Sequence, residues 1–570
     1  MSTIFGVLFL EACSSKTKKI ESVSVAFPHQ VLKKTTTSII DNGPIDRTFG
    51  EVAPYKFSGD DSEHAHQILW DIPNYIQSIG GKIPEITERV PIVVIGGGMS
   101  GLFSAFRLKR YLPIVLERAE RFGGNNRGES WRGIDYSLNG TQVKTPKEES
   151  GLYELLKELE LNRMLNSNQE NISVIYNGKV FQHLLKGDID PSAAKQGATL
   201  ELYFSDLLEN KNGRIFPEIP PQNQAQIEII KELDKKTLKE HLKIILAVEI
   251  IHPHLEMWIE HICWTTCGGS YREISAAVGV NQLSREFGKK LVLQGGTSLI
   301  AEQLLNKLKK TIGSDRLRSG ALVFQVKSTA EGVLVTYEQN GQNKTILAES
   351  VVMACPKYVV AKIFQNIEPE REKVIRRIRY NSQLIANILL NRKISFSFNK
   401  LNIFNSIKIN LKELQAIAEA DQTILLFNGT FARESQKGGI LTLVRPFPYQ
   451  LGTSQLYSTG AYLKYRKEIV NQVETEILPT LGVPSSDIAG VRLARWGHTT
   501  PVALPGFLSS GLIEISHKPF ANNVYFVNKD NWLNPCIESS YAEANKWAPQ
   551  LVQALEERRI AKQKELGPKL

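Results

Sequence analysis

Apolar residues in this 570-residue chain recur in two spacings, one typical of buried strands and one typical of amphipathic helices. Short continuous apolar runs at residues 92–95 and 114–116 predict buried strands, and the amphipathic segment between them predicts a helix. Residues 321–326, 333–337 and 350–354 predict three more strands. Because a strand, a helix and a strand in this order form a βαβ unit, the pattern predicts a parallel sheet with helices on its faces.

The segments between and after these strands follow a different pattern. Apolar positions at helical spacing predict a mostly helical region at residues 150–161, 223–246 and 253–267. Strand-like runs predict a second sheet at residues 382–390, 424–428 and 440–444, followed by a helix at 465–478. We therefore expect a chain of the α/β class, with a Rossmann-like domain and an interleaved α+β domain.

A glycine-rich turn joins the first predicted strand to its helix. Gly96 allows the chain to turn sharply, Gly98 allows backbone N–H groups to approach a pyrophosphate, and Gly101 allows the helix to lie close to the sheet. Met99 and Ser100 stand at the start of the helix, whose N-terminus favours negative charge. The spacing predicts a dinucleotide-binding site.

The residues at the end of the second predicted strand distinguish between dinucleotides. Glu117 stands about twenty residues after the first glycine, where a carboxylate accepts hydrogen bonds from an adenosine ribose and repels a 2′-phosphate. The following segment, residues 118–128, contains a glycine pair and an arginine, and it resembles the flavin amine oxidase superfamily. The resemblance implies FAD, and it implies cofactor contacts from Arg118, Gly123, Gly124, Asn125 and Arg127.

Two later blocks of the chain carry the same resemblance. Gly295 and Gly296 open a predicted helix, and the strands after it imply that Val326 contacts the adenine. In the last block, residues 524–532 and the helix from about Glu538 imply that Asp530 binds the ribityl chain and that Ser539 lies near the flavin pyrimidine. This block departs from the family, because Asn528 and Lys529 precede Asp530 where the family has a glycine followed by an acid.

The resemblance also implies three candidate catalytic residues. Many members have a lysine in a substrate-domain strand that holds a water near flavin N5, and this chain has Asn387 in that region. His498 lies where relatives approach the flavin, and it can donate a hydrogen bond or titrate near neutral pH. A loop histidine bonded to backbone is the structural alternative. Trp496, two residues earlier, is also a candidate, although packing explains it more simply.

The resemblance implies an FAD-dependent oxidoreductase that transfers a hydride from a C–N or C–C bond of a small or apolar substrate to flavin N5. Oxygen or another electron acceptor would then reoxidise the flavin. A desaturase or isomerase is an alternative, because the lysine is missing. A redox-inactive flavin-fold scaffold in the bacterial envelope is another, because the last block is poor in glycine.

Composition and charge agree with a large globular protein of two or more domains. Hydrophobic residues make up 42% of the chain and charged residues 22%, and the net charge is +10. Because the basic residues are spread along the chain and no nucleic-acid-binding motif occurs, we expect no nucleic-acid partner. The positive charge leaves two kinds of binding partner open, an anionic membrane surface and an acidic substrate.

The amino end resembles a lipoprotein leader. An apolar run at residues 4–10 precedes Ala12 and Cys13, and this arrangement resembles the lipobox of bacterial lipoproteins, in which the cysteine is lipidated. Glu11 inside the box and the absence of an early Lys or Arg favour a cytosolic chain instead. The polar tether after Cys13 favours the envelope slightly. Any membrane association would be through lipid or surface contact, because no stretch is apolar enough to span a bilayer.

The five cysteines do not form a disulfide framework, because their number is odd and their spacing is wide. Cys263 and Cys267 are about one helical turn apart, and three histidines lie nearby at positions 252, 254 and 261. A buried apolar helix face explains these cysteines more simply than a metal does, so no metal is expected.

The order of the three FAD-binding blocks gives the expected domain plan. The expected divisions are a leader and polar tether at 1–50, an N-terminal extension at 51–90, a first FAD-binding segment at 91–150, a helical cap at 151–285, a second FAD-binding segment at 286–365, a substrate-domain sheet at 366–510, a third FAD-binding segment at 511–560 and a tail at 561–570.

Overall fold

Three separate segments of the chain build one seven-stranded sheet. The computed structural model describes residues 56–161, 166–168 (backbone only), 171–394, 396, 398–404, 422–430 and 437–565. The strand order is β11-β3-β2-β14-β13-β12, and β20 pairs with β14. The strands are β2 (Ile86–Ile95), β3 (Ile114–Leu116), β11 (Leu317–Arg318), β12 (Ala321–Thr329), β13 (Gly332–Gln339), β14 (Gln342–Met353) and β20 (Val524–Phe526). β2 is parallel to both β3 and β14, as the βαβ pattern predicts.

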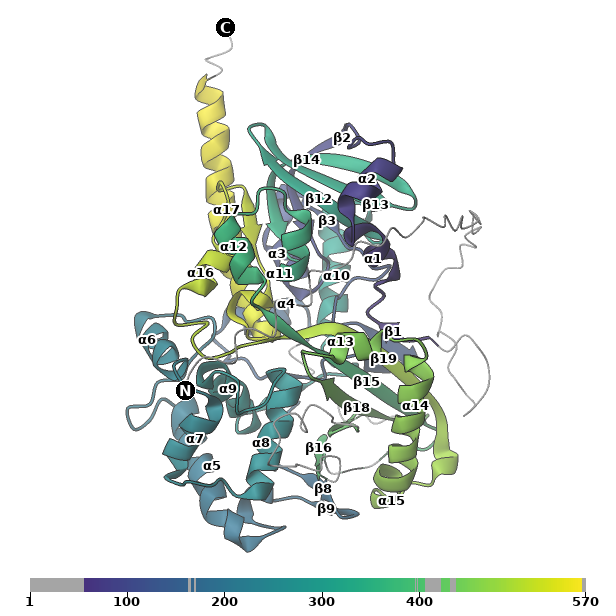
Figure 1. Cartoon of the computed structure of the whole chain (residues 1–570), viewed down its shortest axis with the longest axis vertical. Helices are drawn as coiled ribbons and strands as arrows, with labels where there is room; N and C mark the ends of the chain where they lie inside the picture. Colours follow the sequence, from purple (N-terminus) through teal and green to yellow (C-terminus); the bar gives the residue numbers. More distant parts are fainter. Residues whose placement is uncertain are drawn as a thin grey trace, which may run out of the picture. The chain divides into compact units, whose positions relative to one another are not determined.

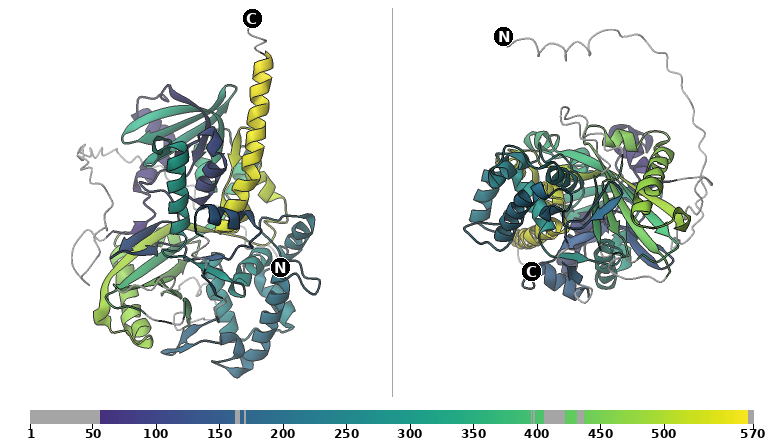
Figure 2. Two further views of the ribbon diagram at one scale, coloured as in Figure 1. Left: turned by 180° about the vertical axis from the view of Figure 1, so that it is seen from behind. Right: turned by 90° about the horizontal axis from the view of Figure 1, so that it is seen from below.

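Helices cover both faces of this sheet. The side chains of β2 alternate between the two faces, with Ile92 and Val94 in one core and Val93 and Ile95 in the other. This arrangement explains why the run is apolar at every position. The first face packs against α3 (Met99–Arg107), α10 (Ser298–Ile312) and α17 (Ile537–Glu565). Figure 2 shows α17, in yellow, and this helix packs on α3.

The second sheet has eight strands and lies in the region of the chain expected to hold the substrate. Its order is β1-β19-β15-β18-β17-β16-β8-β9. The strands are β1 (Ser58–Gly59), β8 (Val174–Tyr176), β9 (Lys179–Phe181), β15 (Arg379–Leu390), β16 (Lys400–Ile403), β17 (Leu425–Asn428), β18 (Gly439–Phe447) and β19 (Ile488–Val502). The α/β fold with an interleaved second domain is therefore confirmed, while the individual domain boundaries stay predictions.

A helical region lies next to the second sheet (Figure 1). Its helices are α5 (Ala194–Leu208), α6 (Gln224–Leu233), α7 (Leu238–Leu246), α8 (Pro253–Thr266) and α9 (Ala276–Leu283). The helical segment expected at 223–246 consists of two helices, because α6 ends at Leu233 and α7 begins at a capping box formed by Thr237 and Glu240. The helix expected at 465–478 is also interrupted. It consists of α14 (Ala461–Gln472), a π-helical turn and α15 (Leu478–Thr480).

The amino-terminal extension forms a short strand and two helices. β1 pairs with β19, with Ser58 opposite Ala494. The helices α1 (Glu63–Leu69) and α2 (Ile72–Ser78) lie beside β12 and β13 in Figure 1, and their apolar side chains belong to the same core as those strands. The leader and Cys13 lie outside the described residues, so lipidation of Cys13 stays a prediction. Within the described ranges no helix is both long and apolar enough to cross a bilayer.

Candidate functional site

A cavity of about 500 Å³ lies at the carboxyl ends of β2 and β3. Its walls come from the glycine turn, the end of β3, the start of β12, the amino-terminal extension, β19 and the segment after β20. In a sheet whose central strands are parallel, this end is where ligands bind.

The glycine turn leaves the N-terminus of α3 open toward the cavity. Gly98 is the N-cap of this helix, and no side chain bonds to the free N–H groups of the first turn. A Cβ built on Gly98 would meet only Gly124 Cα, at 3.7 Å, whereas one built on Gly101 would lie 1.8 Å from Gly96 O. Gly98 therefore leaves space for a ligand, and Gly101 allows the helix to pack. Gly96, Met99 and Ser100 line the cavity beside Gly98.

Glu117 stabilises the same turn. Its Oε2 accepts a hydrogen bond from the Gly97 N–H at 2.7 Å, and its Oε1 accepts one from the Ala119 N–H at 2.8 Å. The carboxylate is 7% exposed and lines the cavity, so it is placed to accept ribose hydroxyls as well.

The second glycine pair packs directly against the first turn. The Gly123 N–H donates to Gly97 O at 2.8 Å, and Gly124 and Asn125 line the cavity. Arg127 also lines it, and its Nε–H donates to Gly124 O at 3.0 Å. Gly123 itself is not among the lining residues, so its role is to support the turn.

The adenine contact at Val326 stays a prediction. Val326 has no exposed surface and is not among the residues that line the cavity, and its carbonyl accepts a hydrogen bond from the Gln365 N–H at 2.9 Å. The residues that line the cavity are Ala321, Leu322 and Val323. A β-bulge between Val323 and Gln325 shifts the register of β12, and sequence periodicity gives no sign of it.

The segment after β20 contributes a buried acid with an unused oxygen. Asp530 is 1% exposed and lines the cavity; its Oδ2 accepts from the Tyr380 hydroxyl at 2.8 Å and from the Lys357 N–H at 3.2 Å. Its Oδ1 has no partner among the described residues. A buried carboxylate oxygen without a donor is rare, and a ligand hydroxyl would satisfy it.

The residue after Ser539 lines the cavity in place of Ser539. The Ser539 hydroxyl bonds to Ile219 O at 3.2 Å and to Asn534 Nδ2 at 3.1 Å, so it faces away from the cavity. Ser540 lines the cavity instead. One residue rotates the side chain by about 100° around a helix, and the helix start at Ile537 sets which serine faces the ligand.

The three candidate catalytic residues have different surroundings. His498 lines the cavity, and its ring packs 4.5 Å from that of Tyr358. Burial lowers the pKa of His498 below its ordinary value, with a partly opposing effect of Asp60, and this favours the neutral ring. Trp496 also lines the cavity, but it is 3% exposed and its Nε1–H donates to Leu138 O at 2.8 Å.

Asn387 is not among the residues that line the cavity, and its catalytic role stays a prediction. It lies in the middle of β15 with no exposed surface. Its Nδ2 donates to Ser137 O at 3.0 Å and its Oδ1 accepts from the Thr442 hydroxyl at 2.6 Å. These bonds satisfy the amide and connect β15 with β18 and the segment after the glycine turns.

Sequence reasoning missed the contribution of the amino-terminal extension. Six of its residues line the cavity: Asp60, Ser62, Ala65, His66, Leu69 and Trp70. Asp60 pairs with Arg118 and accepts a hydrogen bond from the Tyr457 hydroxyl at 3.1 Å. Burial would raise the pKa of Asp60, but the Arg118 guanidinium holds it below its ordinary value. The sequence of the extension gives one indication, which is the helical spacing of apolar residues in 65–72. This spacing predicts a packed helix but does not reveal that the helix lines the cavity.

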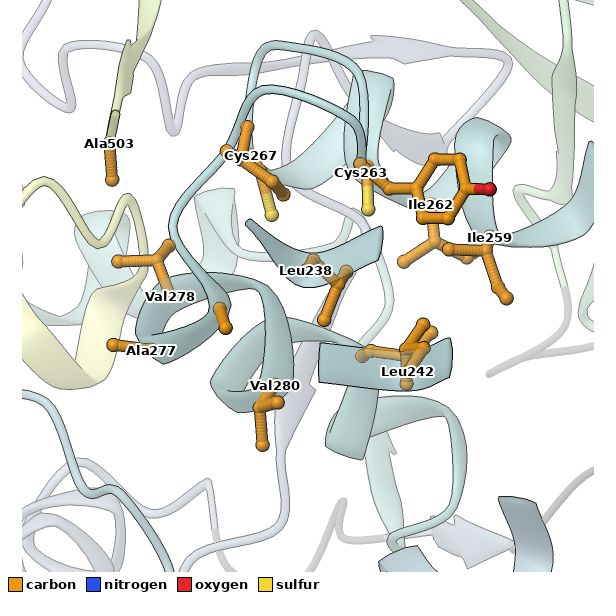
Figure 3. Close-up of a cluster of buried hydrophobic side chains, with 14 of the residues drawn as sticks. Leu238, Leu242, Ile259, Ile262, Cys263, Cys267, Ala277, Val278, Val280 and Ala503 are labelled. Atoms are coloured by element: carbon orange, nitrogen blue, oxygen red, sulfur yellow. The ribbon is translucent and has the colours of Figure 1, made fainter. Parts of the chain in front are cut away.

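The cysteines and histidines considered as metal ligands have different surroundings. Cys263 and Cys267 are buried in the apolar cluster of Figure 3, among residues of α7, α8 and α9. Asp190, His252 and His254 offer possible ligand atoms within 4.8 Å of one another. However, His252 Nδ1 accepts from the His254 N–H, so its Nε2 carries the proton and donates to Asp190. A metal would have to displace that proton.

The residues of the cavity fit a flavin dinucleotide. The open helix N-terminus suits a pyrophosphate, Glu117 suits a ribose, and the unpaired Oδ1 of Asp530 suits a ribityl hydroxyl. These features define the class of flavin-binding proteins with a Rossmann-like domain.

Comparison with known proteins gives the family. A model described as flavin containing amine oxidoreductase matches residues 99–419, which is more than half of the chain. The chain belongs to this family of flavin-dependent oxidoreductases, whose flavin cofactor is consistent with FAD.

Individual relatives are distant in sequence. The chain is 22% identical to oxidoreductase PigB of Serratia sp. (strain ATCC 39006) over 493 residues, which cover 78% of this chain and 72% of PigB. The structure of putrescine oxidase bound to putrescine is similar with a TM-score of 0.59 at 14% identity, covering 82% of this chain and 99% of that one. A fatty acid isomerase from P. acnes has a TM-score of 0.56 at 12% identity, covering 81% and 98%. At these identities, the two structures show the fold alone.

Proposed function

We propose that this protein uses FAD to remove a hydride from a C–N or C–C bond of a small-molecule substrate. The observation that carries the proposal is the unpaired Oδ1 of Asp530 in the wall of a cavity that also contains the open N-terminus of α3. The two features suit the two ends of one ligand, a ribityl chain and a pyrophosphate. Membership of a flavin-dependent family supports the redox chemistry.

Bound FAD supplies a two-electron acceptor, so the substrate carbon loses a hydride while the adjacent nitrogen or carbon loses a proton and a double bond forms. Oxygen or another electron acceptor removes the two electrons afterwards. The chain's own contribution is to bind and orient. The neutral ring of His498 lies in the cavity wall beside Tyr358, and it is able to accept a proton or a hydrogen bond.

The test uses the full-length chain as purified. We expect the absorption spectrum of a bound flavin, with FAD released on heating in a ratio near one per chain. Anaerobic addition of a substrate should bleach this spectrum, and candidate amines and saturated carbon substrates should be compared in the same assay. A colourless chain that does not bind added FAD would overturn the proposal and would favour the scaffold alternative.

An isomerase or desaturase is the second candidate function. The position of Asn387 favours it, because β15 presents no lysine to the cavity. Oxygen uptake separates an oxidase from an isomerase. An oxidase consumes one oxygen molecule for each substrate molecule oxidised, whereas an isomerase converts substrate with no net oxygen uptake.

A further inference from the structure

A second cavity, of about 240 Å³, adjoins the flavin cavity. The two cavities share four lining residues: Asn125, Asn126, Lys529 and Ser540. The second cavity extends from these residues to the helical region and the second sheet. A molecule bound there would therefore contact residues that also line the first cavity, which is the position a substrate needs.

The charged side chains that line the second cavity are mostly positive. The cations are Lys144, Arg285, Lys290, Lys400 and Lys529, and the carboxylates are Glu286 and Glu538. Five cations against two carboxylates give the cavity a positive excess. Isolated charge away from water is unfavourable, so this excess indicates a negatively charged ligand.

Ion pairs already engage both carboxylates. Glu286 accepts from Lys290 at 3.2 Å and from Lys400 at 2.7 Å, and Glu538 pairs with Arg285 at 3.0 Å. Burial would raise the pKa of Glu286, but the two ammonium groups hold it at about 2. The carboxylates are therefore ionised and paired at neutral pH, and the cavity keeps its positive excess.

Lys529 is the cation in this cavity that lacks an acidic partner. Its Nζ donates to Thr499 O at 2.7 Å, and no carboxylate lies within ion-pair distance of it in the described residues. Burial lowers the pKa of Lys529, with an opposing effect of Asp530. An anion bound beside Lys529 would favour its charged form. Lys144 differs, because Glu218 lies 4.0 Å from its Nζ.

Apolar side chains also line the second cavity. They include Leu425 and Phe427 of β17 and Val444 of β18, and all three are buried. A ligand that matches both kinds of lining residue carries a negative group and an apolar body.

We propose that the second cavity binds the substrate as a small organic anion, with a carboxylate paired to Lys529 and an apolar body against β17 and β18. This inference rests on the proposed function, because it assigns the substrate of the same flavin site. It adds the class of substrate, and it disfavours simple amines, whose positive charge the cavity would repel.

Three probes of similar shape and different charge test the inference. Benzoate, benzamide and benzylamine are titrated calorimetrically into the full chain as purified, so binding is measured whether or not flavin is present. We expect benzoate to bind at least about 10-fold more tightly than the other two, which corresponds to about 1.4 kcal/mol. Higher salt should weaken benzoate selectively.

Substitutions at Lys529 test whether this residue causes the preference for benzoate. Lys529→Met should lose the preference for benzoate by about 10-fold, and Lys529→Arg should keep it within about 3-fold, because the charge is retained. Lys327→Met is the matched control, because Lys327 is exposed on β12 and lines neither cavity.

Three results would overturn the inference. The first is binding of benzylamine as tight as that of benzoate. The second is failure of benzoate, phenylacetate and hexanoate alike to bind at about 10 mM, which corresponds to roughly 3 kcal/mol of binding free energy. The third is a Lys529→Met variant that loses binding of all three probes equally and also has a shifted flavin midpoint potential. That result would assign this lysine to the flavin instead.

The outcomes for the two proposals are distinguishable. A chain that binds FAD and is bleached by neutral substrates, but does not prefer benzoate, contradicts the anion site and leaves the proposed function standing. A chain without flavin contradicts the proposed function, and calorimetry still decides the charge preference of the second cavity.

Discussion

Gly98 and Gly101 belong to one glycine-rich segment, but only Gly98 has room around it for a side chain. A Cβ on Gly98 has only one neighbour, at 3.7 Å, while a Cβ on Gly101 would lie 1.8 Å from a backbone oxygen. Gly98 also has an extended backbone that any residue adopts, with φ of −76°. The motif alone does not separate a glycine needed for the ligand from one needed for the fold.

Gly98→Val should therefore remove FAD and leave the fold intact. We expect FAD content to fall at least about 10-fold, because the side chain occupies the approach to the helix N-terminus. Cofactor release and thermal unfolding of the apoprotein measure the two effects. Gly101→Val is the contrast, and it should lower the yield of folded chain. Retention of full flavin content in Gly98→Val would show that the pyrophosphate does not bind at this turn.

Individual residues also differ in whether their position could be predicted from the sequence. The glycines, Glu117 and Asp530 were predictable because each performs a backbone or charge function that few residue types provide. Near the expected contacts at Val326 and Ser539, the residues that line the cavity are Val323 and Ser540. A bulge in β12 and the exact start of α17 determine which side chains face the cavity, and neither has a sequence signature.

At the scale of elements, the amino-terminal extension is the segment whose role no motif revealed. Its sheet contact, between β1 and β19, positions Asp60 against Arg118 and brings α1 to the cavity wall. Gly59 makes this contact possible, because it has φ of +86° and a Cβ there would lie 2.6 Å from Arg495 O.

Gly59→Val should detach the extension from β19. We expect weaker FAD retention, by about 10-fold or more, because Asp60, His66 and Trp70 lose their positions in the wall. The FAD dissociation constant and limited proteolysis within residues 56–85 measure the change. Gly80→Val controls for the strain of a positive φ, since Gly80 has φ of +103° and no neighbour within 4 Å. Equal effects of the two substitutions would contradict a specific role of β1.

The buried parts of three long strands were predictable for a simple physical reason. The apolar runs at 92–95, 350–354 and 382–390 fall in or at the end of β2, β14 and β15, where the strands are buried. Breaks inside helices were not predictable in the same way. The capping box at Thr237 and the π-helical turn after Gln472 interrupt segments whose apolar spacing continues through them.

At the scale of the whole molecule, buried histidines link stability to pH. His261 is fully buried, and neither ring nitrogen has a hydrogen-bond partner among the described residues. Burial, with a smaller effect of Lys400, lowers the pKa of His261 to about 3, from an ordinary value of 6.5. Between these values the unfolded chain binds a proton that the folded chain does not, so stability falls as the pH falls from about 6.5 toward 3.

His261→Phe should flatten this dependence. The slope of the unfolding free energy should decrease by up to about 1.4 kcal/mol per pH unit in that range, the contribution of one proton. Denaturant unfolding of the parent chain and the variant at pH 7, 6 and 5 measures it. An unchanged slope would show that His261 titrates normally in the folded state.

The position of β20 has a consequence for biosynthesis. β20 pairs with β14, more than 170 residues earlier in the chain (Val351 with Val524), and only after it come Asp530 and α17. The glycine turn of the cavity is therefore synthesised well before Asp530 and α17, and the cavity is complete only when both parts of the chain have been made. Until then the apolar face that α17 covers lacks this helix, and that interval is when a chaperone would be needed most.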